Sequence, residues 1–422
     1  MAKQCRQADG RGQACAVAHL VGHLVAGAVA GALHIPYPRG LRERGDRMQT
    51  EKRELVALNG RFTAVDQPTG VQAAAGELFT QLVLADRPFD LLIYADSTAG
   101  VVREWAGAPG VRIEHVPFRS WGRARAQLHE QIVISRRARQ AGARLLYHPI
   151  NTCPRYQGHQ GHLPQVVTLH DLNFHHNPQW YGRSFRTWLE HTTIPGLSRA
   201  AHVVCISDHV VGDAIRTLEL DPGRVSRIYD GLRRLSPGRE VARDRDLVLA
   251  VNPFQPHKNL PRLIEAMSIL RKERPSVRLR VVGRAQENFR GHEKIADALA
   301  VEWVHLTGYI DETQLAEEYC AASVLCMPSF EEGFGMPLIE AMSFGASVVT
   351  SNLSCLPETA GPAGILIDPH SAQSIADGLR TALTESGAGR EAREEAGRAH
   401  AARFSWATAA AEYTELFSRL MR

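Results

Sequence analysis

From Glu54 onward, the sequence alternates short apolar runs rich in Val, Ile and Leu with longer segments of helical periodicity. This alternation is typical of a parallel β-sheet with helices on both faces, because parallel neighbours are joined by crossovers long enough to hold a helix. It occurs in two consecutive series, so the sequence predicts two α/β domains. The first series has candidate strands at residues 55–60, 89–95, 111–118, 145–150, 165–171, 202–207 and 225–231. The second series has candidate strands at residues 246–253, 277–283, 304–310, 323–329, 347–352 and 364–368.

Between the two series, residues 232–246 are charged, contain a Pro-Gly pair and lack apolar periodicity, which is typical of a linker between domains. With 422 residues, 44% of them apolar, the chain can bury a separate core in each domain. Open parallel sheets bind ligands at the carboxyl ends of their strands. We therefore expect two doubly wound, Rossmann-like domains that face a cleft, with the functional site in that cleft.

The N-terminal segment has an unusual composition. Residues 14–35 are long enough to span a bilayer, but they consist mainly of Ala, Gly and Val and are interrupted by histidine, so their hydrophobicity is weak. The basic start of the chain would also fit a signal peptide. An ordinary opening strand follows within a few residues of Met48. We expect residues 1–47 to be a poorly ordered, Ala-rich extension that takes no part in the fold.

Charge and cysteine content exclude several classes of protein. The net charge is only +4 with 22% charged residues, which argues against a nucleic-acid-binding protein. The seven cysteines are odd in number and scattered, and no Cys-x-x-Cys pair occurs, which argues against a disulfide framework and against a structural zinc finger. We therefore infer a reducing compartment and expect a cytoplasmic protein with no nucleic-acid partner.

The residues that point most directly to chemistry lie at 328–340, where the sequence reads PSFEEGFGMPLIE. A candidate strand ends here, a loop with two glycines follows, and Pro337 stands where the first turn of a helix would begin, a position that suits proline. Backbone amides of residues 334–338 and the positive end of the helix dipole would form an anion site suited to a phosphate or diphosphate. Gly333 and Gly335 would let the backbone approach such an anion closely.

Two glutamates flank this expected anion site, Glu332 before it and Glu340 after it. A carboxylate is repelled by a diphosphate, so both side chains are expected to point past the phosphates. A carboxylate that accepts two hydrogen bonds is well matched to the vicinal hydroxyls of a sugar. One glutamate could therefore hold a transferred sugar and the other a ribose.

The arrangement of Glu332, seven residues and Glu340 resembles the donor domain of family-four retaining glycosyltransferases of the GT-B architecture (glycosyl transferases group 1, mannosyltransferase-like). TGYIDETQLAEEYCAASVLCMPS before it, SNLSCLPETAGPAGILIDP after it and PHKNLPRLIEA at 256–266 resemble the same family. So do four segments of the first series: NGRFTAVDQPTGVQ, LLYHPINTCP, VTLHDLNF and VCISDHV. The resemblance covers about residues 55–422. It implies transfer of a sugar from a nucleoside diphosphate sugar with retention of configuration, without a bound metal or other cofactor.

Carried over by position, the resemblance assigns most donor contacts to the second domain. Glu332 would contact hydroxyls of the transferred sugar, Glu340 would bind the ribose, and Lys258 would neutralise the diphosphate. A fixed cation acts there because negative charge develops on the leaving group as the glycosidic bond breaks. The implied donor-binding residues are Gly70, Lys258, Gly333, Phe334, Gly335, Met336, Leu338 and Glu340.

From the first domain, the resemblance implies that Gly70 brings backbone amides to the same phosphates and that His170 lies against the sugar and the acceptor, near the reacting carbon. Asp171 would orient His170. The implied catalytic residues are therefore His170, Asp171 and Glu332. No protein nucleophile is evident, which suits a reaction in which the leaving phosphate itself takes the proton of the acceptor.

The sequence departs from the family pattern in three places. The family usually has a Gly-Arg pair shortly before the lysine, with the Arg as a second cation for the diphosphate, whereas residues 251–255 here read VNPFQ. Lys258 is therefore expected to be the only cation of that pair. Ala73 stands where an Arg is common, and Asp230-Gly231 replaces a common Asn-Gly pair. These last two departures leave the handling of the acceptor open.

On the same basis we place an N-terminal, acceptor-side domain at residues 48–235 and a C-terminal, nucleotide-sugar-binding domain at 240–400. A final helix within residues 401–422 is expected to cross back to the first domain. GDP-mannose is the expected donor, with UDP- and dTDP-sugars as alternatives. An oligosaccharide or a lipid-linked saccharide in surface polysaccharide (lipopolysaccharide) biosynthesis is the expected acceptor.

Other activities compete with this interpretation. A nucleotide-sugar epimerase or a sugar phosphorylase of the same architecture would use the same cleft. A dehydrogenase is disfavoured because no Gly-x-Gly-x-x-Gly follows the first strand of either series. A zinc-dependent protein is a further alternative because metal-ligating residue types are dense here, although their spacing is irregular. They are His148, Cys153, His159, His162, His170, Asp171, His175 and His176.

The segment at 121–144 is rich in arginine. It has enough basic residues to contact an anionic membrane, which would place the protein at the inner face of the plasma membrane. The alternative is an ordinary solvated helix face.

Overall fold

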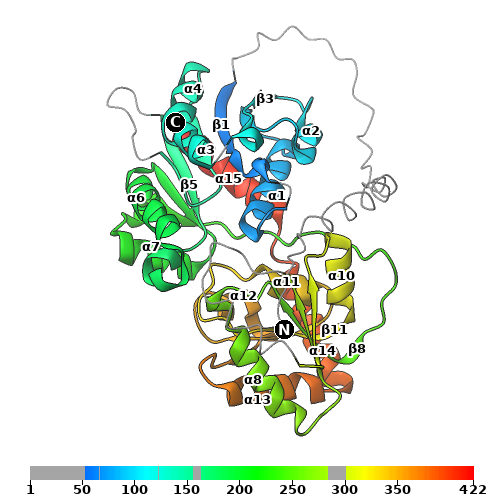
Figure 1. Cartoon of the computed structure of the whole chain (residues 1–422). Helices are drawn as coiled ribbons and strands as arrows, with labels where there is room; N and C mark the ends of the chain where they lie inside the picture. The colour runs from blue at the N-terminus through cyan, green and yellow to red at the C-terminus, as the bar shows by residue number, and fades with distance from the viewer. Residues whose placement is uncertain (1–52, 66, 122, 155–162, 284–300) are drawn as a thin grey trace, which may run out of the picture. The chain divides into compact units, whose positions relative to one another are not determined.

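A computed structural model describes residues 53–65, 67–121, 123–154, 163–283 and 301–422 (Figure 1). Residues 52–422 form one compact unit. The Ala-rich extension expected at residues 1–47 lies outside the described residues. The described residues of this unit form two α/β halves, each built on one parallel sheet.

The first half is built on a seven-stranded parallel sheet with the order β3-β2-β1-β4-β5-β6-β7. Helices lie between most consecutive strands, although none is described between β4 and β5, and the parallel strands are joined by crossovers. The strands are β1 (Glu54–Gly60), β2 (Phe89–Ala95), β3 (Val111–His115), β4 (Leu145–His148), β5 (Gln165–Leu169), β6 (His202–Cys205) and β7 (Val225–Arg227).

The second half is built on a six-stranded parallel sheet with the order β10-β9-β8-β11-β12-β13. The strands are β8 (Asp244–Val251), β9 (Arg278–Val282), β10 (Val304–Gly308), β11 (Ala322–Met327), β12 (Ser347–Ser351) and β13 (Ile365–Ile367). Every predicted strand has a counterpart in the two sheets, and the predicted fold class of two doubly wound, Rossmann-like halves is confirmed.

Several strands are shorter at their carboxyl ends than the apolar pattern suggested. The run predicted as 165–171 ends at Leu169, and the run predicted as 225–231 ends at Arg227. The next residues leave the sheet, and His170 and Asp171 are among them. Hydrophobic patterning cannot distinguish the last strand residue from a buried residue that turns toward a site.

In each sheet the strand order reverses once, between β1 and β4 in the first half and between β8 and β11 in the second. Neighbouring crossovers leave in opposite directions at such a point and open a crevice at the carboxyl ends of the two strands. The helices that supply these crossovers in the first half are α1 (Gly70–Leu84), α2 (Gly100–Trp105), α3 (Arg123–Leu128), α4 (Ile134–Gln140), α5 (Asn173–His176), α6 (Arg183–Arg199) and α7 (Asp208–Leu218). Those of the second half are α8 (Leu260–Arg271), α10 (Glu312–Ala321), α11 (Met336–Ser343) and α12 (Leu356–Ala360), and α13 (Ala372–Thr384) and α14 (Gly387–Ala401) follow the last strand.

The last helix, α15 (Trp406–Met421), packs beside α1, as Figure 1 shows. Its buried face includes Tyr413 and Phe417, which lie against Tyr147 of β4 with ring centroids 5.1 and 5.2 Å away. The apolar core of the first half therefore contains side chains from the end of the chain.

Candidate active site

The segment at 328–340 has the local structure that its sequence predicted. β11 ends at Met327, and α11 begins at Met336 with Pro337 in its first turn. Gly335 precedes the helix with φ of +95°, a conformation that glycine adopts without a steric cost. The amide of Leu338, however, donates to the carbonyl of Gly335 at 2.9 Å. That amide is therefore bonded within the first turn of α11, and the phosphate contact of Leu338 stays a prediction.

Lys258 and Glu332 form an ion pair, with 2.6 Å between Nζ and Oε1. Lys258 ends a 3₁₀ turn after β8. The next residue, Asn259, bonds that turn to the loop at residues 328–335, called the motif loop below, by donating to the carbonyl of Pro328 at 3.1 Å. Burial alone would raise the pKa of Glu332, but the charge of Lys258 outweighs it, and the pKa lies below its usual value. The Glu332 carboxylate is therefore ionised at neutral pH.

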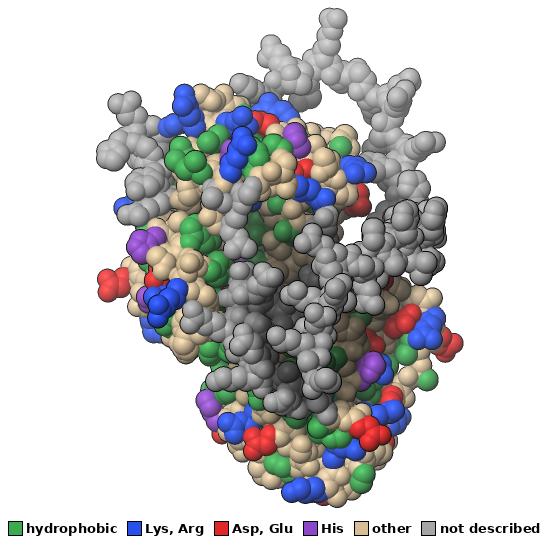
Figure 2. Space-filling view, in the orientation of Figure 1, with side chains coloured by type: hydrophobic (Ala, Val, Ile, Leu, Met, Phe, Trp, Pro, Cys, Tyr) green, Lys and Arg blue, Asp and Glu red, His purple; other side chains and the backbone are tan. Residues whose placement is uncertain are grey.

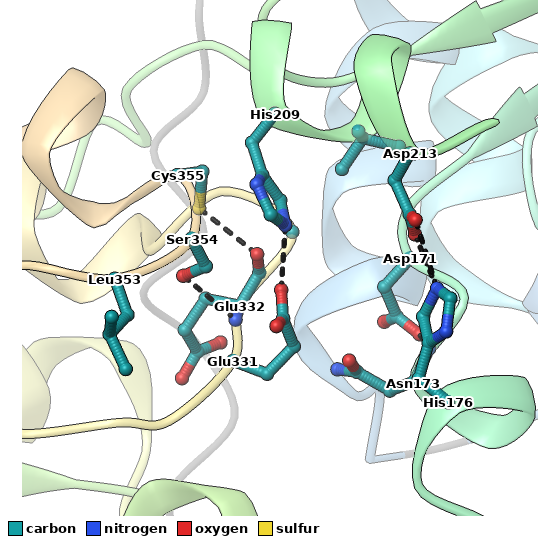
Figure 3. Close-up of polar contacts among 12 residues, drawn as sticks. Asp171, Asn173, His176, His209, Asp213, Glu331, Glu332, Leu353, Ser354 and Cys355 are labelled. Atoms are coloured by element: carbon teal, nitrogen blue, oxygen red, sulfur yellow. Dashed lines mark hydrogen bonds and ion pairs between the residues drawn. The ribbon is translucent and has the colours of Figure 1, made fainter. Parts of the chain in front are cut away.

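The backbone of Glu332 is fixed by α12 and the loop before it. Its amide donates to Ser354 Oγ at 3.2 Å, and Cys355 Sγ donates to its carbonyl at 3.2 Å (Figure 3). A small pocket lies at the reversal point of the second sheet and is lined in part by Lys258, Ser329 and Pro337. The expected cation and the start of α11 thus border one pocket, as an anion site requires.

Glu340 is 1% exposed and both of its oxygens have protein partners. Arg233 Nε donates to Oε1 at 2.6 Å, and the hydroxyl of Tyr319 donates to Oε2 at 2.6 Å. Arg233 also pairs with Glu312 at 3.2 Å. The sequence predicted an available carboxylate for a ribose, and the structure instead shows one that is fully bonded.

Arg233 was missed by the sequence analysis, because it lies in a segment without periodicity that was interpreted as a solvated linker. Burial would lower its pKa, but Glu340 raises it, so the guanidinium remains charged. The second half therefore does contain a buried cation besides Lys258, at a position that no motif indicated.

His170 follows β5 and is almost completely buried. Its backbone amide donates to Asn151 Oδ1 at 2.7 Å, and its ring Nε2 donates to the carbonyl of Pro149 at 2.9 Å. Burial lowers the pKa of His170 to about 4, so the ring is neutral at pH 7. Because Nε2 carries the proton, Nδ1 is a hydrogen-bond acceptor.

Asp171 does not orient His170 as expected. The ring is held by Pro149, and the Asp171 carboxylate accepts from the amide of Asn173 at 3.0 Å. Burial, together with the charges of Glu332 and Glu331, raises the pKa of Asp171 to about 6. The influence of these glutamates reflects how near Asp171 lies to the motif of the second half, and Figure 3 shows the three side chains in one view.

The two halves meet where the motif loop reaches the carboxyl ends of β5 and β6. A Cβ at position 333 would overlap the backbone oxygen of His170, so only glycine fits there. Ser207 Oγ donates to the carbonyl of Gly333 at 2.7 Å. His209 Nε2 and Glu331 Oε1 lie 2.7 Å apart (Figure 3). The structure therefore places the backbone of His170 against Gly333, the residue that follows Glu332, and the roles assigned to His170 and Glu332 stay predictions.

The remaining site predictions are placed as follows. Gly70 is the first residue of α1, and a Cβ there would have no described atom within 4 Å, so the structure leaves its proposed phosphate contact as a prediction. The side chain of Phe334 is buried beside Tyr229, with ring centroids 5.9 Å apart. Met336 packs against the core of the first half.

No group of three His, Cys, Asp or Glu side chains within the described ranges could hold a metal ion. His148 is buried and bonded to Asn59 and Gln165, and His176 pairs with Asp213 at 2.9 Å. His159 and His162 lie outside the described residues. The zinc alternative therefore gains no support from the histidines that the structure describes.

Comparison with known proteins matches almost the whole of the two-sheet unit. Residues 234–401 match the family described as glycosyl transferases group 1, and residues 70–233 match glycosyltransferase family 4. The chain is 29% identical over 274 residues to O-antigen chain mannosyltransferase B of Escherichia coli, covering 60% of this chain and 70% of that protein. It is 30% identical over 236 residues to a D-inositol 3-phosphate glycosyltransferase of Streptomyces scabiei, covering 50% of this chain and 52% of that protein.

Among solved structures, sucrose-phosphate synthase from Thermosynechococcus elongatus superimposes with a TM-score of 0.68 at 20% identity. The superposition covers 87% of this chain and 99% of that one. At this identity the likeness concerns the fold. It agrees with two parallel sheets of Rossmann type in one chain.

Proposed function

The chain belongs to the group 1, family-four glycosyltransferases of GT-B architecture, and from that premise we propose that it transfers a hexose from a nucleoside diphosphate sugar to a saccharide or lipid-linked saccharide, with retention of configuration. The observation that carries the proposal is the Lys258–Glu332 pair beside the pocket of the second sheet, with the next residue, Gly333, packed against the backbone of His170. It combines a cation for a diphosphate with a carboxylate for sugar hydroxyls at one point.

The charges at the site support separate roles for Lys258 at the diphosphate and Glu332 at the sugar hydroxyls. Departure of a nucleoside diphosphate places negative charge on the leaving oxygens, and Lys258 and the start of α11, which border one pocket, would stabilise that charge. Lys258 would then exchange Glu332 for the diphosphate, which leaves Glu332 to accept from sugar hydroxyls. The proposed reaction draws its positive charge from the protein, so it uses no metal cofactor.

The neutral ring of His170 fits a role beside the reacting carbon. Its Nδ1 can accept a hydrogen bond from a sugar hydroxyl, while Nε2 is held by Pro149. A neutral acceptor of this kind positions a hydroxyl without adding charge next to a sugar that becomes positive. The proton of the attacking hydroxyl passes to the leaving phosphate in this scheme.

We take mannose as the transferred sugar and GDP-mannose as the donor, because one relative is an O-antigen chain mannosyltransferase. The proposed setting is cytoplasmic assembly of a surface polysaccharide. A relative named for D-inositol 3-phosphate keeps a phosphorylated acceptor open as the second candidate.

Two measurements test the function. In a thermal-shift screen of GDP, UDP and dTDP, the matching nucleotide at a hundred times its Kd stabilises by about 2.7 kcal/mol. Product analysis with labelled GDP-mannose, with and without methyl α-D-mannoside, then separates the alternatives. Transfer to the mannoside supports the proposal. An altered nucleotide sugar formed without acceptor indicates an epimerase, and dependence on inorganic phosphate indicates a phosphorylase.

We further propose a peripheral contact with an anionic membrane through α3, the π-helical turn His129–Val133 and α4. Leu128 and Ile132 are each 58% exposed and stand one turn apart. Arg125, Arg136 and Arg139 are exposed around them. Figure 2 shows Lys and Arg side chains next to hydrophobic ones over this part of the first half. No described helix is both long and apolar enough to cross a membrane.

Vesicle flotation tests this contact. Each arginine near an anionic surface contributes about 1 kcal/mol, so recovery with phosphatidylglycerol vesicles should exceed recovery with neutral ones. Ile132→Ser should reduce it, whereas Leu84→Ser, at a residue 59% exposed at the end of α1, should not. Equal recovery with both kinds of vesicle would refute the contact.

A further inference from the structure

A second small pocket lies at the reversal point of the first sheet, between the ends of β1 and β4, and the sequence analysis assigned no role to the residues that line it. Open α/β sheets bind ligands at such points, and in the second sheet the corresponding pocket borders Lys258. The pocket of the first sheet is lined by Asn59, Arg61, Phe62, Glu130, Pro149 and Ile150.

The carboxylate of Glu130 is buried, and its two oxygens differ in the hydrogen bonds that they accept. Oε1 accepts from Asn59 Nδ2 at 2.8 Å and from Thr152 Oγ1 at 3.1 Å. Oε2 has Arg61 Nε 3.2 Å away as an ionic partner, but among the described residues it has no hydrogen bond. A buried carboxylate oxygen without a hydrogen bond is costly unless something else supplies a donor.

The surroundings fix this carboxylate rather than let it relax. Glu130 stands in the π-helical turn His129–Val133, a rare conformation that occurs often at functional sites. Asn59 also donates to His148 Nδ1 at 3.1 Å, and burial lowers the pKa of His148 to about 3, so this histidine is neutral. The charges that border the pocket are therefore one carboxylate and one guanidinium.

The pocket is directly connected to the proposed reaction centre. Pro149 lines it, and the carbonyl of Pro149 accepts the hydrogen bond that holds the His170 ring. A group bound beside Pro149 would thus lie on the first-half side of the place where His170 meets the motif loop.

We propose that this pocket is the subsite for hydroxyls of a neutral acceptor saccharide, with Glu130 Oε2 accepting from one hydroxyl and Arg61 donating to a neighbouring oxygen. This inference rests on the proposed glycosyl transfer and specifies its acceptor. Neutral hydroxyls both donate and accept, so they satisfy the carboxylate and the guanidinium together. A phosphorylated acceptor would bring its charge against Glu130.

The test is the affinity for methyl α-D-mannoside, measured by saturation-transfer NMR with the nucleoside diphosphate present, so that it does not depend on turnover. Arg61→Gln is the main variant because the side chain is 22% exposed and its loss leaves the core intact. We expect Arg61→Gln and Glu130→Gln to weaken mannoside binding about ten- to hundredfold, the loss of one charge-assisted hydrogen bond. The Kd of the nucleoside diphosphate should stay within about twofold of wild type.

Glu114→Gln is the matched control, since Glu114 forms an exposed pair with Arg137 at 3.1 Å in the same half. Unchanged mannoside affinity in Arg61→Gln would overturn the subsite, and so would tighter binding of D-inositol 3-phosphate than of the mannoside by the wild type. Equal loss of nucleotide and mannoside binding in Arg61→Gln would also overturn it. Failure of the proposed function is distinct, because the wild-type chain would then bind no nucleoside diphosphate in the same samples.

Discussion

Each half of the molecule buries one arginine–glutamate pair, and the two pairs differ in how completely they are bonded. In the second half, Glu340 receives Arg233 and Tyr319, so both oxygens are satisfied by the protein. In the first half, Glu130 has hydrogen-bond donors on Oε1, whereas Oε2 has Arg61 Nε 3.2 Å away as an ionic partner and no hydrogen bond among the described residues. We call the Glu340 arrangement, in which both carboxylate oxygens are bonded, a closed pair. We call the Glu130 arrangement, in which a buried oxygen beside a pocket lacks a hydrogen bond, an open pair.

The difference has a consequence for the nucleotide. If Glu340 binds the ribose of the donor, the ribose hydroxyls have to replace Arg233 on Oε1. Arg233 lies in the segment between the two sheets and also contacts Glu312, so it has a second carboxylate to hold it when released. In that case Arg233 occupies Oε1 of Glu340 until the ribose hydroxyls replace it, and Arg233 then keeps its contact with Glu312.

Arg233→Met is expected to give the largest effect. Removing one partner of a buried pair typically costs about 3–5 kcal/mol because the other charge is left uncompensated. Arg61→Met should cost clearly less, since its pair lacks a hydrogen bond and lies at a pocket. Denaturant unfolding of the two variants measures the contrast, and equal losses would remove the distinction between a closed and an open pair.

Arg233→Met also tests whether the ribose of the donor replaces Arg233 on Glu340. With its competitor gone, Arg233→Met should bind the nucleoside diphosphate about tenfold more tightly, and a 2′,3′-dideoxy analogue should show no such gain. Arg239→Met, which removes an exposed pair with Glu317, serves as the control. Weaker nucleotide binding in Arg233→Met would mean that the arginine supports the site rather than closing it.

Gly333→Ala tests the contact between the halves. The new Cβ would overlap the backbone oxygen of His170, and neither backbone can yield without moving the motif loop away from β5. We expect a loss of about 1–3 kcal/mol in stability and at least a tenfold fall in kcat/KM. Gly100→Ala, where a Cβ would meet no described atom, should be close to wild type in both assays. Normal activity in Gly333→Ala would show that the halves need not meet here for catalysis.

The sequence predicted the two sheets and the motif loop, because strand patterning and the Gly-Phe-Gly-x-Pro start of α11 are local signals. It did not predict the bonding of Glu340, since Arg233 is 107 residues away and its segment has no periodicity. Nor did it predict that Pro149 would hold His170, because a backbone carbonyl leaves no trace in residue type. The Glu130 pocket was missed because it depends on the order of strands within the sheet.

Glu332→Gln should separate turnover from nucleotide binding. The contact of Glu332 with the transferred sugar would strengthen as the sugar becomes positive, so its loss appears in kcat, about ten- to hundredfold. Nucleoside diphosphate affinity should be preserved, because Lys258 is released from its ion pair and stays available. Steady-state kinetics and calorimetry measure the two effects, with Glu317→Gln as a control on α10. Loss of nucleotide binding in Glu332→Gln would place this residue at the nucleotide instead.

His209→Gln should have the smallest effect, and a pH-dependent one. The hydrogen bond that His209 Nε2 donates to the Glu331 carboxylate raises the pKa of His209, against burial, with Asp213 adding to the rise and Arg216 opposing it. The pair therefore stabilises fully below about pH 6.5 and its contribution, about 0.2–1 kcal/mol, is lost as pH rises through the raised pKa. The free energy of unfolding, measured from pH 5.5 to 8.5, should depend less on pH in His209→Gln than in the wild type. It should be unchanged in its pH dependence in His191→Gln, where the ring bonds to the carbonyl of Thr187. An unchanged pH profile would contradict this role.

Calorimetric titration of the nucleoside diphosphate into Lys258→Ala and His170→Ala tests most directly that the second half holds the nucleotide and the first half supplies the reacting centre. The account predicts that Lys258→Ala weakens binding about ten- to hundredfold, the loss of one charge-assisted contact, whereas His170→Ala stays within about twofold of wild type. Comparable weakening in both variants, or wild-type affinity in Lys258→Ala, would contradict the division of labour between the halves.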